Sequence, residues 1–71
     1  MASELYWDDQ SKVVANLESA SADVSQALAL LFAYEPDPRL ALSHIADARA
    51  SLLAAAEALR IGLNRKRRPR K

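Results

Sequence analysis

The residues best suited to chemistry are the last seven, RKRRPRK, of which six are basic. They are Arg65, Lys66, Arg67, Arg68, Arg70 and Lys71. The 64 residues before them hold four basic and nine acidic side chains, so this body carries a net charge of −5 and the tail carries +6. Arginine, the commoner basic residue here, pairs with phosphate oxygens through two parallel hydrogen bonds. The composition therefore predicts a C-terminal tail, residues 65–71, that contacts the phosphates of DNA or RNA.

His44 is the only histidine, and Asp47 follows it within hydrogen-bonding reach on a helix. A catalytic pair would also need a nucleophile, and no serine lies at a recognisable spacing from His44. We therefore interpret His44 as a half-exposed helical side chain. Because the chain has no cysteine and a single histidine, it forms neither a cysteine site nor an all-histidine zinc site, and we predict no metal site.

The carboxylates near the N-terminus are not arranged for catalysis. Asp8 and Asp9 are adjacent, so on a helix they point in different directions and form no cation-binding loop. We expect them to cap a helix or to complement its dipole. The single glycine allows no phosphate-binding loop, and no two carboxylates are spaced convincingly for hydrolysis. The sequence therefore predicts that the chain is not an enzyme and has no cofactor.

These residues must be positioned by helices, and the segment YEPDPRL is the one strong break in the helical pattern. Pro36 and Pro38 each exclude a helix interior and disfavour helix in the residue before them. Asp37 followed by Pro38 is typical of an N-cap with proline in the first helical position. We predict helices at about 8–34 and 38–63, which form one helical hairpin over residues 1–64.

Apolar residues repeat along both segments with alternating steps of four and three. In the first segment they are Val13, Leu17, Ala20, Val24, Ala27, Leu31 and Tyr34. In the second they are Ala41, Ile45, Ala48, Leu52, Ala55, Leu59 and Gly62. Each set divides into a column of large side chains and a column of small ones. The pattern predicts an all-α, antiparallel two-helix hairpin in which large side chains of one helix fill the space beside alanines of the other.

An antiparallel hairpin brings particular charges together. It places the start of the first helix beside the end of the second, so part of the basic tail is expected to neutralise Glu4, Asp8 and Asp9. It also predicts that Asp23 and Arg49 lie close enough to form an ion pair across the two helices. Such a surface pair contributes only about 0–1 kcal/mol to stability, but it would help to fix the register.

More apolar residues are present than one helix pair can bury. We predict that a second copy covers them, so that two hairpins form a four-helix bundle. The predicted dimer interface comprises Val14, Leu28, Phe32, Leu42 and Leu53. In the alternative interpretation the N-terminal residues 5–7 fold back over this surface within a monomer. We expect Tyr6 and Trp7 to close the open end of the hairpin rather than to stack on nucleobases.

The inferred architecture resembles that of the small dimeric helical-hairpin regulators of plasmids that bind RNA. The resemblance is one of architecture, and no diagnostic motif identifies a family. That role would place basic residues on the helix faces, whereas here the basic residues gather at one end. No functional residue is therefore carried over from that family.

The sequence predicts a small non-enzymatic regulator or adaptor that self-associates through its hairpin and binds DNA or RNA through its tail. In the alternative, it is a protein–protein interaction module or assembly factor that uses the apolar hairpin face, and the tail serves steering or solubility. Docking on an acidic membrane has the least support, because no basic amphipathic helix or lipidation signal is present. The N-terminus lacks the features of a secretory signal, which predicts a cytoplasmic protein.

Overall fold

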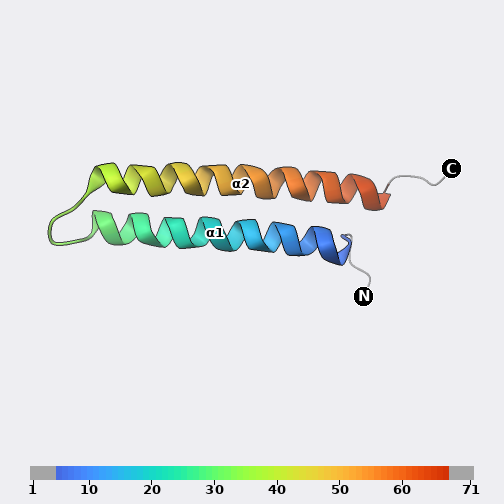
Figure 1. Cartoon of the computed structure of the whole chain (residues 1–71), viewed down its shortest axis with the longest axis horizontal. Helices are drawn as coiled ribbons and strands as arrows, with labels where there is room; N and C mark the ends of the chain where they lie inside the picture. The colour runs from blue at the N-terminus through green and yellow to red at the C-terminus, as the bar shows by residue number, and fades with distance from the viewer. Residues whose placement is uncertain (1–4, 68–71) are drawn as a thin grey trace.

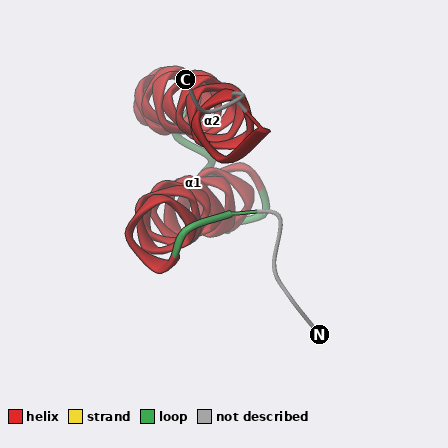
Figure 2. Ribbon diagram, turned by 90° about the vertical axis from the view of Figure 1, so that its right-hand side faces the viewer, coloured by secondary structure: helices red, strands yellow, loops and turns green. Residues whose placement is uncertain are grey.

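The computed structural model of the chain describes residues 5–67, which form two α-helices. Helix α1 spans Trp7–Leu31 and helix α2 spans Pro38–Arg67. The helices lie side by side and run in opposite directions, so the start of α1 lies beside the end of α2 (Figures 1 and 2). The predicted all-α, two-helix hairpin is thus confirmed. Its extents of 59 × 21 × 12 Å make it a single layer of helices, about as thick as one helix with its side chains.

The connection between the helices, residues 32–37, is longer than the sequence suggested. Helix α1 ends at Leu31, and not near Tyr34, and the amide of Phe32 at its C-cap donates a hydrogen bond to the carbonyl of Leu28 (3.0 Å). The amide of Asp37 donates a hydrogen bond to the carbonyl of Leu30 (3.1 Å), which closes this turn. The side chain of Asp37 then accepts a hydrogen bond from the amide of Leu40 (3.1 Å). This bond confirms Asp37 as the N-cap of α2.

The other helix ends also differ from expectation. Tyr6 stands at the N-cap of α1 and makes no side-chain capping bond, while Asp8 and Asp9 lie in the first turn, where they complement the helix dipole. Helix α2 continues past the expected end at residue 63, through Gly62, to Arg67. Gly62 keeps a right-handed backbone, and a Cβ atom there would lie 3.0 Å from Cβ of Asp9. The glycine therefore permits a close approach of α1 and α2 at this end of the hairpin.

Small side chains form the line of contact between the helices. Val13, Ala20 and Ala27 of α1 are at most 7% exposed. Ala41, Ala48 and Ala55 of α2 are at most 4% exposed. No larger side chain of the described residues is fully buried. The predicted small columns are therefore confirmed, and they allow the two backbones to lie close together.

The large columns do not fill the space between the helices as predicted, and each of their members is 38–48% exposed. They are Leu17, Val24, Leu31, Ile45, Leu52 and Leu59. A different set of partly buried residues flanks the alanines on the other side: Asn16, Asp23, Leu30, His44, Ser51 and Ala58. The physical reason is the close approach of the helices. Alanine contacts leave no room for leucine between the backbones, so the large side chains of both helices lie on one face of the hairpin.

Candidate interaction surfaces

The large columns of both helices lie on the same side of the hairpin. They follow the buried columns by four residues in each helix, and in an antiparallel pair these flanking positions face the same way. Val24 of α1 accordingly lines a common depression with Ile45 and Leu52 of α2. We define the apolar face by ten residues: Val14, Leu17, Val24, Leu28, Leu31, Leu42, Ile45, Leu52, Leu53 and Leu59. Arg49 borders the same depression and brings one positive charge to it.

The residues predicted to form a dimer interface are all exposed in the hairpin. Val14, Leu28, Leu42 and Leu53 are 45–65% exposed and flank the large columns, while Phe32 is 85% exposed just beyond the end of α1. The hairpin itself therefore leaves this surface open to solvent. The large columns supply the other six of the ten residues of the apolar face. They were not predicted to lie on this face, because the heptad pattern was interpreted as placing them in the helix–helix contact.

Residues 5–7 do not cover the apolar face, whose members remain 38–65% exposed. Leu5 lies against Gly62 at the open end of the hairpin, where its Cδ2 atom is 2.9 Å from the position of a Cβ on that glycine. Trp7 is 74% exposed, so the expectation that it closes this end is wrong. Tyr6 does contribute there, because the guanidinium of Arg65 lies 5.5 Å from the centre of its ring.

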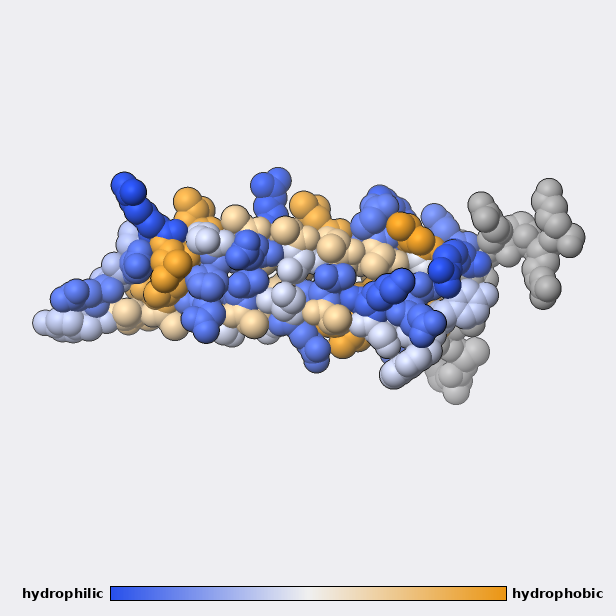
Figure 3. Space-filling view, in the orientation of Figure 1, coloured by the Kyte–Doolittle hydropathy of each residue, from blue (hydrophilic) through white to orange (hydrophobic). Residues whose placement is uncertain are grey.

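The opposite side of the helix contact is polar, and we call it the polar edge. Here Nδ1 of His44 lies 3.0 Å from Oδ1 of Asp23, and the hydroxyl of Ser51 lies 3.5 Å from that of Ser19. Hydrophilic side chains cover much of the line along which the helices meet in Figure 3. The hairpin as a whole is therefore amphipathic, with an apolar face and a polar edge on either side of the alanine contact.

The predicted pair between Asp23 and Arg49 is wrong, because Asp23 pairs with His44. Asp23 and His44 occupy matching positions, each three residues after a buried alanine, and so meet on the polar edge. Arg49 follows the buried Ala48 by one residue, which places it on the other side. His44 is partly buried, as interpreted from the sequence, and 28% of its side chain is exposed.

Arg65, the first residue of the predicted tail, belongs to the hairpin. Its Nη2 atom lies 3.2 Å from Oδ2 of Asp9, whose side chain is 7% exposed. That oxygen accepts no directed hydrogen bond from the described residues, so the attraction is one of charge. The expected neutralisation of N-terminal acids by the basic segment is thus confirmed for Asp9. Lys66 and Arg67 continue the backbone of α2, while Arg68, Arg70 and Lys71 lie outside the described residues.

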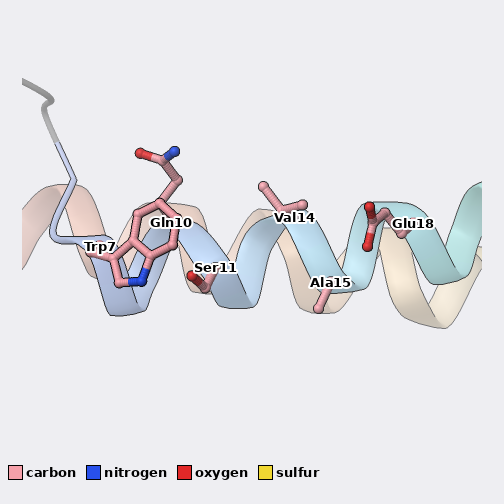
Figure 4. Close-up of a pocket in the computed structure, with 6 residues that line it drawn as sticks. All are labelled: Trp7, Gln10, Ser11, Val14, Ala15 and Glu18. Atoms are coloured by element: carbon pink, nitrogen blue, oxygen red, sulfur yellow. The ribbon is translucent and has the colours of Figure 1, made fainter.

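A further depression runs along α1 and includes Val14 of the apolar face (Figure 4). Its walls come from one helix only: Trp7, Gln10, Ser11, Val14, Ala15 and Glu18. The indole of Trp7 and the amide of Gln10 lie together at one end, and Glu18 lies at the other (Figure 4). A groove on a single helix offers few converging polar groups, so it is less suited to a small ligand than to a side chain of a partner.

A scan against protein-family models and searches of curated proteins and of solved structures found no match to this chain. Within residues 5–67, neither helix combines the length and the apolar character that crossing a membrane requires.

Proposed function

We propose that this chain is a small non-catalytic binding module. Two hairpins pair through their apolar faces to form a four-helix bundle, and the basic C-terminal segments contact the phosphates of DNA or RNA. The observation that carries the proposal is the half-exposed column of large side chains on each helix, beside a helix contact made almost wholly of alanine.

Burial energy favours a second layer on the apolar face. Complete burial of a valine, leucine or isoleucine side chain is worth about 1.5–3 kcal/mol, and the ten residues of the face are 38–65% exposed. Covering them would contribute on the order of 10 kcal/mol for each hairpin. Association of two molecules costs about 4–15 kcal/mol in lost motion. Two apolar faces together therefore supply enough energy to hold a pair of hairpins.

The form of the face favours a second copy as the partner. Domains are built from at least two packed layers, and this hairpin supplies one. Leu17, Val24 and Leu31 recur at the same spacing as Ile45, Leu52 and Leu59, so either helix presents a similar row to a copy related by a two-fold axis. Short chains without disulfides commonly gain stability by such association.

The charge distribution supports phosphate contact at the C-terminal end. The body of the chain is net negative, which disfavours binding of nucleic acid along its length, and six positive charges follow within residues 65–71. Arg65 is engaged with Asp9, so we assign the contact to Lys66, Arg67, Arg68, Arg70 and Lys71. Such contacts are electrostatic and carry little base preference.

Sedimentation equilibrium of the intact chain tests the pairing. We expect a dimer at micromolar concentration, and Leu52→Glu should convert it to monomers or unfold it, because the substitution places a charge within the apolar face. Ala50→Glu, two residues away on an exposed outer position of α2, is the matched control and should leave the dimer intact. An intact chain that is folded and monomeric at 100 micromolar would contradict the proposal.

A second candidate function uses the same face for a different protein, which would make the hairpin an interaction module or assembly factor. A folded monomer would favour it, because the apolar face would then be free to bind another chain. The two candidates make the same prediction for Leu52→Glu in binding experiments, so the oligomeric state of the unmodified protein distinguishes them.

A further inference from the structure

Three potential metal ligands converge on the polar edge, where α1 contributes Asp23 and α2 contributes His44 and Asp47. One ring nitrogen of His44 and one oxygen of each aspartate all lie within 4.8 Å of one another. We propose that these three side chains bind a divalent transition-metal ion of the zinc type. This inference goes beyond the proposed function and does not depend on the apolar face or on the basic tail.

The donor atoms suit such an ion. Zinc is bound by histidine nitrogen and by carboxylate oxygen, with bonds of about 2.0–2.2 Å. Donor atoms around a tetrahedral ion are then about 3.4 Å apart. The 3.0 Å between His44 and Asp23 is already close to this value. Asp47 is exposed, and it lies one turn after His44, so rotation of its side chain can complete the set.

The surroundings also suit a cation. The side chains of Asp23 and His44 are 20% and 28% exposed, so an ion can enter while the site stays partly shielded from water. The two carboxylates match the charge of a divalent ion. The nearby Arg49 lies toward the apolar face rather than on this edge, where it would oppose binding. Three protein ligands leave at least one coordination position for water or for a further ligand.

The competing explanation is a simple hydrogen bond between His44 and Asp23. That bond accounts for two of the three residues and leaves the position of Asp47 without a role. The two explanations differ in their consequence for stability. An ion shared by both helices would hold α1 against α2 from the polar edge, whereas a hydrogen bond alone would make the hairpin indifferent to metal.

Titration of the full chain with zinc chloride, followed by calorimetry and thermal melting, tests the site. We expect one ion per chain, and a rise in melting temperature on the order of 10 °C at a hundred-fold excess over the dissociation constant. Asp47→Asn should weaken binding at least tenfold while it preserves the bond between His44 and Asp23. His44→Gln should have at least as large an effect.

Glu18→Gln is the control, because it removes one exposed carboxylate from the outer side of α1. It should leave both the affinity and the thermal shift unchanged. The proposal is overturned if the unmodified chain shows no saturable heat and no thermal shift. It is equally overturned if Asp47→Asn and Glu18→Gln bind zinc as tightly as the unmodified chain, since the ion would then bind scattered surface acids.

Discussion

Asp9 is a carboxylate in the line of contact between the helices, and Arg65 supplies the opposite charge. Burial of a charge is costly unless it is paired, so this arginine stabilises the open end of the hairpin in a way that an exposed cation would not. The surrounding contacts act in the same direction, because Tyr6 lies under the guanidinium and Gly62 lets α2 approach Asp9. Arg65, the first residue of the basic segment, therefore contributes to the stability of the hairpin.

Substitution of Arg65 should reveal this role. We expect Arg65→Gln to lower the free energy of unfolding by about 1–3 kcal/mol, because it leaves the buried carboxylate of Asp9 without its partner. The control is Arg60→Gln, which breaks an exposed pair with Glu57 and should cost about 0–1 kcal/mol. Urea unfolding of the two variants makes the comparison. Equal losses would show that the Asp9–Arg65 pair is no stronger than a surface pair.

At the scale of the helices, the alanine columns set the distance between α1 and α2. Ala48 is 4% exposed, so replacement by leucine forces a larger side chain into the contact. We expect Ala48→Leu to destabilise the hairpin by about 1–3 kcal/mol. Ala54→Leu, at an exposed position of the same helix, adds the same atoms and should change stability much less. Thermal melts that show equal effects would contradict the assigned contact.

The heptad pattern predicted the helices, the turn and the small columns, but not which neighbour of each alanine faces inward. Leu17 and Asn16 both lie beside the buried Val13 on the helix surface, and sequence alone favours the leucine. The structure places Asn16 in the partly buried position and Leu17 on the apolar face. That choice depends on the spacing of the two backbones, which is a property of the packed pair.

The candidate metal site was hidden from the sequence for a related reason. His44 and Asp47 are close along the chain and were recognised together, but Asp23 lies 21 residues from His44 and joins them only across the hairpin. The sequence offered Arg49 as the partner of Asp23, because the antiparallel register places both residues at about the same distance from the turn. Deciding between the two edges of the hairpin required the orientation of each helix about its own axis.

At the scale of the whole molecule, the number of basic side chains in the proposed phosphate contact can be measured from the salt dependence of binding. With five basic side chains in contact with duplex DNA, the logarithm of the binding constant should fall against the logarithm of salt with a slope of about −4.5 per tail. Arg68→Gln should reduce the slope by about 0.9. Arg65→Gln should leave it unchanged, because Arg65 is engaged with Asp9. Fluorescence anisotropy over a salt series measures all three slopes.

Absence of binding to DNA and RNA at low salt, where the electrostatic attraction is strongest, would contradict the assignment of the tail. A slope that falls equally in Arg65→Gln and Arg68→Gln would instead place Arg65 among the phosphate contacts. Neither result would affect the apolar face, which is tested separately by the oligomeric state.

The alanine contact between the helices has a consequence for the amount of protein a cell must make. A hairpin whose fully buried side chains are no larger than valine gains little from folding alone. If the second layer comes from another copy, folding and pairing are one equilibrium, and the folded fraction rises with the abundance of the chain. Dilute chains would be unfolded and open to proteolysis, whereas abundant ones would protect each other. The small residues would thereby set a threshold of expression below which the module does not accumulate.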